Sequence, residues 1–257
     1  MGRCCSRGFI LAMPLRAIVF DCDGVLVDSE PLHLKAFQET LRQEGIEINR
    51  EDYVEKYLAL DDRTCFETAF RENKKELSPG KLEFLMEKKA KAYAQATRGG
   101  NLLVFPGVPE FVMAASQNYA LAVASGALRQ EVEQALEAAG IRAYFEAIVT
   151  ANDVVNGKPD PEPYLKALEA LNGSGKRARI SPQECVVIED ARHGVAAAHA
   201  AGMKCVAIST SHPAYELSVA DLVMPEISAL KLSQLEDLFQ VAAPPLAPHS
   251  QPRGQNQ

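Results

Sequence analysis

Residues 18–33 read IVFDCDGVLVDSEPLH, and this stretch places carboxylates at the end of an apolar run. Asp21 directly follows the apolar residues, and Asp23 and Asp28 lie within seven residues of it. Burial and like-charge repulsion both disfavour ionised carboxylates, so such a group beside a buried strand is unstable by itself. A cation or a reacting group that needs negative ligands would stabilise it. The stretch therefore predicts that other parts of the chain supply partners for these acids.

The bulk properties are those of an ordinary globular protein. The chain has 257 residues, of which 47% are hydrophobic and 24% charged, and its formal net charge is −7. The acidic balance argues against a nucleic-acid surface, and no apolar run reaches the roughly 20 residues that span a bilayer. The six cysteines lack zinc-type spacing, and several lie in apolar runs, as reduced cytosolic thiols do. We expect a cytoplasmic monomer or weak dimer that binds a small molecule and neither nucleic acid nor a membrane.

Short apolar runs alternate with helical patterns along most of the chain. The runs are about five residues long, and several are rich in Val and Ile, which predicts strands buried on both faces. They occupy residues 16–20, 120–124, 147–151, 185–189, 204–208 and 220–224. Helical patterns follow at residues 128–140, 161–171 and 194–202. Strands that alternate with helices predict an α/β fold with a Rossmann-like parallel sheet.

One interval interrupts this alternation. Between the first and second predicted strands, residues 31–45, 50–58, 63–75 and 79–96 carry helical patterns instead. We therefore expect residues 30–105 to form an all-helical cap inserted into a core of residues 14–29 and 106–242. Residues 1–13 are expected to be a leader that is disordered or not native, and residues 243–257 a disordered tail.

Chemically useful residues collect where the predicted strands end. In an open parallel α/β sheet, ligands bind beyond the carboxyl ends of the strands. Those ends carry an acidic pair, a hydroxyl beside a glycine, a lysine and a second acidic pair: Asp21 and Asp23, Ser125 and Gly126, Lys158, and Glu189 and Asp190. Carboxylates meeting at one point suit Mg²⁺, which takes oxygen ligands and commonly bridges to phosphate. A lysine and a small hydroxyl suit the remaining phosphate oxygens.

This inventory predicts phosphoryl transfer. With charge neutralised by the metal and Lys158, Asp21 can attack phosphorus and form an acyl phosphate. Asp23 can protonate the leaving oxygen and then activate water. Each piece also has a structural interpretation, because an Asp-x-Asp triplet is commonly a solvated turn and an acidic pair can cap a helix. The prediction depends on four separate strand ends each supplying a needed role.

Four segments resemble the sequence motifs of the haloacid dehalogenase superfamily of phosphotransferases. They are VFDCDGVLVDSEPLH (19–33), ASGA (124–127), GKPDPEPY (157–164) and VIEDARHG (187–194). The likeness is greatest to the phosphatase and β-phosphoglucomutase group, which carries a helical cap after the first motif. It implies Asp21 as nucleophile, Asp23 as general acid and base, and Ser125 as a phosphate ligand. It also implies that Lys158 steadies the nucleophile. Asp190 would bind Mg²⁺ together with Asp21 and the Asp23 carbonyl, and Glu189 would join these ligands or position them.

The resemblance extends to the cap, with departures. His33 occupies the place of a hinge histidine that assists the acid/base residue in the mutases. Arg63 resembles a cap arginine that holds a distal phosphate, although Asp61 and Asp62 stand beside it and put that role in doubt. The fourth motif has Ala191 where relatives often have Ser, and then Arg192 and His193 in place of small residues. This departure keeps the acidic ligands but alters what lies beside them.

Several functions remain open at this point. The leading one is a Mg²⁺-dependent phosphatase of a small phosphorylated metabolite, such as a sugar phosphate, and the second is a phosphosugar mutase that uses the same residues. A dehalogenase of the same fold would need no metal, and Asp23 with the second acidic pair argues against it. A response-regulator receiver shares an acidic cluster, a hydroxyl and a lysine, but it has no helical insertion. A non-catalytic binding protein is disfavoured because no expected catalytic position is lost.

Overall fold

The core of the protein is a six-stranded parallel sheet. The computed structural model describes residues 14–57, 60, 62–98 and 103–240. The sheet strands are β1 (Ala17–Phe20), β4 (Ala120–Ala124), β5 (Ala147–Val149), β6 (Cys185–Glu189), β7 (Lys204–Ile208) and β8 (Leu222–Met224). They lie in the order β5-β4-β1-β6-β7-β8, and every neighbouring pair is parallel. The α/β fold with a Rossmann-like parallel sheet is thus confirmed, and each predicted strand is present.

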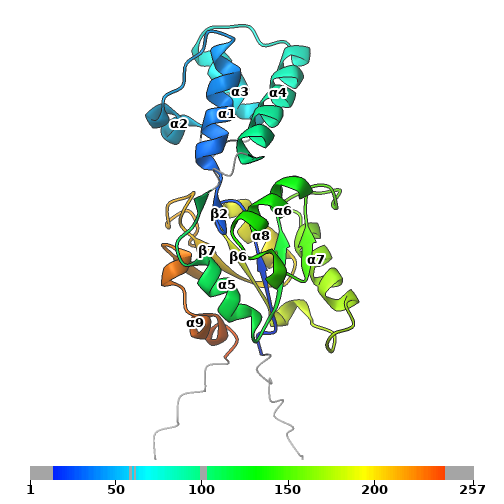
Figure 1. Cartoon of the computed structure of the whole chain (residues 1–257). Helices are drawn as coiled ribbons and strands as arrows, with labels where there is room; N and C mark the ends of the chain where they lie inside the picture. Colours follow the sequence, from blue (N-terminus) through cyan, green and yellow to red (C-terminus); the bar gives the residue numbers. More distant parts are fainter. Residues whose placement is uncertain (1–13, 58–59, 61, 99–102, 241–257) are drawn as a thin grey trace, which may run out of the picture.

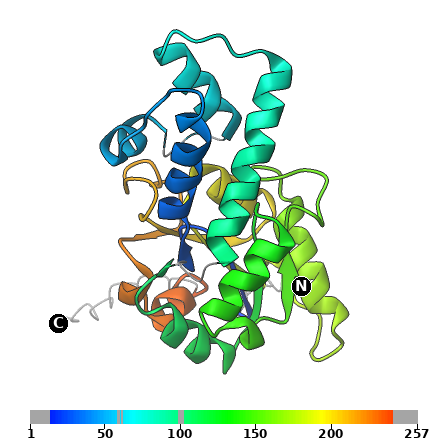
Figure 2. The same ribbon diagram turned by 45° about the horizontal axis from the view of Figure 1, so that its top comes forward.

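Both faces of the sheet are covered by helices, which explains why its strands are apolar throughout. In β1, Ile18 and Phe20 point into one core, whereas Ala17 and Val19 point into the other. The first core is closed by α5 (Val108–Ser116), α6 (Arg129–Ala138) and α9 (Leu232–Asp237), and the second by α7 (Glu162–Gly173) and α8 (Arg192–Ala200). Figures 1 and 2 show these two helical layers around the sheet. Short 3₁₀ turns occupy Arg142–Tyr144, Pro182–Glu184 and Ile227–Ala229.

A second, helical unit is inserted after β1, and it stands above the carboxyl ends of the strands (Figure 1). We call it the cap; it comprises α1 (Glu30–Arg42), α2 (Arg50–Lys56), α3 (Asp62–Glu72) and α4 (Pro79–Arg98). The cap has a core of its own, in which Phe37, Phe66 and Leu85 are buried. The chain enters and leaves it through two short antiparallel strands, β2 (Val27–Asp28) and β3 (Leu103–Val104), which the sequence analysis did not predict.

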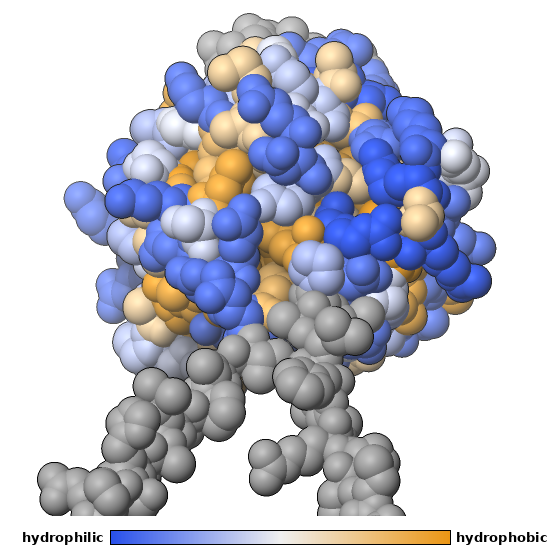
Figure 3. Space-filling model, turned by 90° about the horizontal axis from the view of Figure 1, so that it is seen from below, coloured by the Kyte–Doolittle hydropathy of each residue, from blue (hydrophilic) through white to orange (hydrophobic). Residues whose placement is uncertain are grey.

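The face of the molecule opposite the cap carries mostly hydrophilic residues with apolar atoms between them (Figure 3). Among the described helices, none combines the length and apolar character needed to cross a bilayer. The four described cysteines are buried, and none of them forms a disulfide bond. The predicted leader 1–13 and tail 243–257 lie outside the described residues.

Candidate active site

The sheet order creates a crevice beside β1. In chain order, the sheet strands first proceed from β1 through β4 to β5, and β6 then returns to the other side of β1. Ligands bind in such α/β sheets where the order reverses, outside the carboxyl ends of the strands. A cavity of about 530 Å³ opens at this place, between the sheet and the cap. Six of the predicted site residues on the core line it: Asp21, Asp23, Ser125, Gly126, Lys158 and Asp190.

Lys158 joins two of the predicted acids. Its Nζ donates to Asp21 Oδ1 at 2.6 Å and to Glu189 Oε1 at 2.7 Å. The three side chains are at most 12% exposed, so these ion pairs are shielded from water. Burial by itself lowers the pKa of Lys158, but the two adjacent carboxylates outweigh burial and raise the pKa above its usual value. Lys158 therefore stays protonated and neutralises part of the local negative charge.

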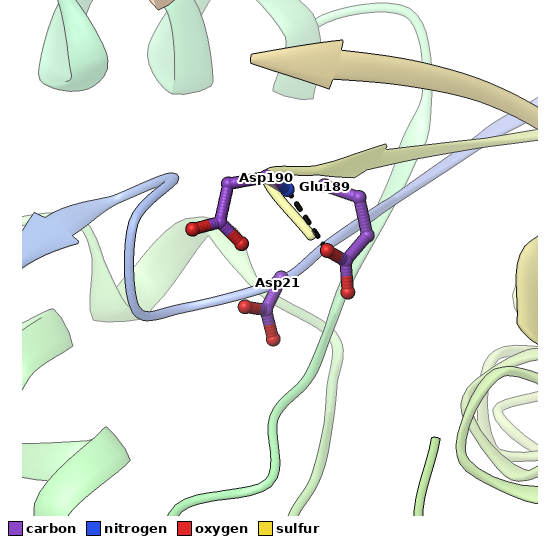
Figure 4. Close-up of side chains that lie close together, drawn as sticks. All are labelled: Asp21, Glu189 and Asp190. Atoms are coloured by element: carbon purple, nitrogen blue, oxygen red, sulfur yellow. Dashed lines mark hydrogen bonds between the residues drawn. The ribbon is translucent and has the colours of Figure 1, made fainter. Parts of the chain in front are cut away.

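Three buried carboxylates lie close together here, and Lys158 pairs with two of them. Carboxylate oxygens of Asp21, Glu189 and Asp190 lie within 4.8 Å of one another, and Figure 4 shows their side chains converging from the ends of β1 and β6. Burial, together with the neighbouring acids, raises the pKa of both Asp21 and Asp190 despite the pull of Lys158. The described residues thus leave excess negative charge at this point, as expected of a site that accepts a cation.

Glu189 is the most fully bonded member of the cluster. Its Oε1 accepts from Lys158 and from the Tyr164 hydroxyl at 2.8 Å, and its Oε2 accepts from the main-chain N–H groups of Asp190 and Ala191. Burial raises the pKa of Glu189, but these partners outweigh burial and lower it. The geometry therefore suits Glu189 to hold Lys158 in place, with less of its capacity left for a metal.

Two glycines allow the backbone to pass close to the acids. Gly24 has a φ of +75°, and a Cβ built there would lie 1.8 Å from Asp190 Oδ2. At Gly194, near the start of α8, a Cβ would lie 1.8 Å from Glu189 Oε1. No side chain fits at either position unless a carboxylate moves.

We expect Gly194→Ala to destabilise the fold by about 1–3 kcal/mol, because Glu189 is held on both oxygens and cannot move aside freely. Urea denaturation of the variant measures this loss. Gly173→Ala is a matched control, because a Cβ there meets no atom within 4 Å. Equal stability of the two variants would contradict the close packing of Gly194 against Glu189.

Asp23 lines the same cavity but is not one of the three clustered carboxylates. Burial raises the pKa of Asp23, while hydrogen bonds from Ser29 and Ser125 moderate the rise. A carboxyl group with a raised pKa is suited to donate a proton. Ser125 also accepts a hydrogen bond from the main-chain N–H of Ala127 at 3.0 Å, which orients its hydroxyl beside Gly126.

The cap contributes a buried histidine, His33, that lies against a lysine. Lys89 Nζ lies 2.7 Å from His33 Nδ1, and the His33 ring stacks on Tyr93 with centroids 4.2 Å apart. Burial and then Lys89 lower the pKa of His33 to about 3. Because an ammonium can only donate, the neutral ring accepts at Nδ1 and carries its proton on Nε2. The carboxylate of Asp62 holds the other side of Lys89 at 2.7 and 2.9 Å.

The sequence analysis did not include Lys89, His193 or His212 among the candidate site residues. The structure places both histidines in the lining of the cavity. Arg63, in contrast, lies on α3 with NH2 2.6 Å from Glu83 Oε1, and it is not among the residues that line the cavity. The neighbouring Asp61 is outside the described residues.

The sheet has helices on both faces, and acids and a lysine gather where its strand order reverses. Together with the helical cap, this architecture is typical of one class of hydrolases. The family model described as haloacid dehalogenase-like hydrolase matches residues 18–208, and the chain belongs to this family. The resemblance noted in the sequence is thereby confirmed, and the protein is an enzyme of the haloacid dehalogenase-like type.

Several related proteins align with more than four fifths of the chain. Protein CbbY of Rhodobacter capsulatus is 29% identical over 88% of this chain and 100% of its own length. The phosphorylated carbohydrates phosphatase of Thermotoga maritima is 30% identical over 82% of this chain and 95% of its own. The solved structure of CbbY from Rhodobacter sphaeroides in complex with phosphate is 27% identical, with a TM-score of 0.70 over 86% of this chain and 99% of that one.

Proposed function

We propose that this protein is a Mg²⁺-dependent phosphatase that hydrolyses a small phosphorylated metabolite, a sugar phosphate by class, through an aspartyl-phosphate intermediate on Asp21. The observation that carries the proposal is the position of Lys158, whose ammonium touches Asp21 at the base of a cavity that Asp23 and Ser125 also line. A nucleophile, an acid and two phosphate ligands therefore face one space. The name of the related phosphorylated carbohydrates phosphatase supports the same reaction class.

The carboxylate cluster fits a divalent cation. One ammonium faces three buried carboxylates, so a cation of charge two would balance them. Oxygen ligands are those that Mg²⁺ prefers. Asp21 and Asp190 would hold it, together with the main-chain carbonyl of Asp23 that the family resemblance implies. When bound, Mg²⁺ would neutralise charge on the transferred phosphate.

In the first step, a carboxylate oxygen of Asp21 attacks phosphorus. The bond from phosphorus to the leaving oxygen breaks, and Asp23 gives its proton to that oxygen. Lys158 and the Ser125 hydroxyl contact the phosphate oxygens and hold them in line for attack. The raised pKa of Asp23 suits the donation, since it keeps a proton available for the leaving group.

In the second step, a water molecule attacks the phosphorus of the aspartyl phosphate. Asp23, now ionised, takes a proton from that water, and the bond between phosphorus and Asp21 breaks to release inorganic phosphate. His33 stands beside this space as a neutral ring whose Nε2–H can donate a hydrogen bond. The cap residues Glu30, His33 and Leu60 form part of the cavity wall, which limits the access of other water molecules.

A phosphosugar mutase would use the same residues, but it needs a place for a second phosphate in the cap. Arg63 is the residue that the resemblance assigns to that task, and its pairing with Glu83 away from the cavity lining favours the phosphatase. Release of free phosphate from a sugar monophosphate supports hydrolysis. Bisphosphate-dependent isomerisation without net release would instead support the mutase.

Removal of metal should silence the enzyme. We expect EDTA to reduce phosphate release from p-nitrophenyl phosphate at least about 100-fold and added Mg²⁺ to restore it. Saturating Mg²⁺ should also raise the melting temperature, since a ligand at 100 times its Kd stabilises the folded state by about 2.7 kcal/mol. Asp190→Asn should abolish this thermal shift. Undiminished turnover in EDTA would contradict the metal requirement.

A further inference from the structure

Part of the cavity wall has no task in the proposed reaction. Asp21, Ser125 and Lys158 surround the place of the transferred phosphate. A different stretch of wall is formed by His193, the second residue of α8, and by Ser211 and His212 in the loop after β7. Ser211 hydrogen-bonds Asp190, so the two histidines are the part of this wall left to contact the rest of the substrate.

The two histidines offer hydrogen-bonding capacity to the cavity. Within the described part of the chain, the His193 ring has no hydrogen-bond or ion-pair partner. His212 has one charged neighbour, with its Nδ1 3.6 Å from Glu216 Oε2, which is beyond hydrogen-bond distance. Burial lowers the pKa of His193, so its ring is neutral and presents one donor and one acceptor. Such groups match hydroxyls, which also donate and accept.

The same cavity offers little to a second anion. Among its described lining residues, Lys158 is the single lysine or arginine, and Asp21 and Glu189 already bind it. Lys89, in the adjoining cavity, is held by both oxygens of Asp62. On the cap side, the wall instead presents the carboxyl group of Glu30. A carboxylate or second phosphate on the leaving group would lose water without gaining a cation, which disfavours it.

We propose that His193 and His212 are specificity residues that hydrogen-bond the hydroxyl groups of an uncharged, polyhydroxylated leaving group. The enzyme accordingly prefers monophosphates of neutral polyols or sugars to substrates that carry a second anion. This inference rests on the proposed phosphatase function and adds the residues that recognise the leaving group of the substrate.

The test compares three substrates in saturating Mg²⁺: glucose 6-phosphate, 6-phosphogluconate, and p-nitrophenyl phosphate, which has no hydroxyl groups. Wild type should favour glucose 6-phosphate over 6-phosphogluconate by at least about tenfold in kcat/KM. His193→Ala and His212→Ala should each raise the KM for glucose 6-phosphate about three- to tenfold, as loss of a neutral hydrogen bond predicts. The kcat, the KM for p-nitrophenyl phosphate and the Mg²⁺ concentration for half-maximal rate should stay within about twofold.

His199→Ala is the matched control, because His199 lies on the same helix, pairs with Asp221 at 3.1 Å and does not line the cavity. His193→Gln, which can still donate and accept, should recover part of the lost affinity and guards against a folding defect in the alanine variant. Equal losses on glucose 6-phosphate and p-nitrophenyl phosphate, or a preference for 6-phosphogluconate, would overturn the inference while the phosphatase function stands. Absence of hydrolysis of all three substrates by wild type would instead overturn the phosphatase function itself.

Discussion

Asp21→Asn should reduce phosphatase turnover by on the order of 10⁴- to 10⁶-fold, the scale found when an enzyme loses its nucleophile. An amide nitrogen and a neutral carbonyl oxygen attack phosphorus far more weakly than a carboxylate, and the acyl phosphate cannot form in the same way. Phosphate release from p-nitrophenyl phosphate in saturating Mg²⁺ measures the loss. Rapid-quench mass spectrometry should find a phosphorylated Asp21 in wild type and none in the variant.

The variant should nevertheless fold. Asp21 lies beside two other buried carboxylates, so removing its charge relieves repulsion in the metal-free protein. We therefore expect the melting temperature of Asp21→Asn in EDTA to equal or exceed that of wild type. Asp160→Asn is the matched control variant. The Asp160 carboxylate accepts a hydrogen bond from the Glu162 N–H and does not line the cavity, so this variant should keep its activity. Full activity in Asp21→Asn would refute the assignment of the nucleophile.

The sheet and the residues at its strand ends were predictable because short-range signals determine them. The run at residues 185–189 is apolar until Glu189, and the strand ends at that residue. Parallel strands bring their carboxyl ends to one edge, so Asp21 and Asp190 could be placed together before any contact was known. The short strands β2 and β3 could not be predicted in this way, because each has two residues and their pairing joins positions 27–28 to 103–104, which are far apart in the sequence.

The cap side of the cavity was less predictable. Lys89 is one of several lysines on α4, and only the packing of α4 against α1 brings its ammonium to His33. A signal did exist, since Leu85, Lys89 and Tyr93 follow one another at spacings of four and Lys89 is 2% exposed between two buried neighbours. A charged residue within an apolar stripe indicates a buried partner. The histidines at 193 and 212 carry no such pattern, because their place in the cavity wall depends on the loops that follow two different strands.

Lys158→Ala should destabilise the protein by about 3–5 kcal/mol, which is the usual cost of removing one partner from a buried ion pair. The Lys158 side chain is 7% exposed, and its loss leaves Asp21 and Glu189 without their shared cation. Urea denaturation in EDTA measures the change free of any metal contribution. Lys91→Ala is a suitable control, because Lys91 pairs with Glu87 on the exposed surface of α4, where a salt bridge contributes little.

The double variant Lys158→Ala, Glu189→Gln separates the structural role of the lysine from its catalytic one. Glutamine at position 189 carries no charge, so the uncompensated charge left by the missing ammonium falls from two carboxylates to one. We expect a positive coupling in the double-mutant cycle, with the double variant more stable than Lys158→Ala alone. Turnover should stay at least about 100-fold below wild type in both, since neither has a cation on that side of the transferred phosphate. Stability and activity that recovered together would show that Lys158 acts only by neutralising the acids. Wild-type stability in Lys158→Ala would show that the cluster does not need its charge.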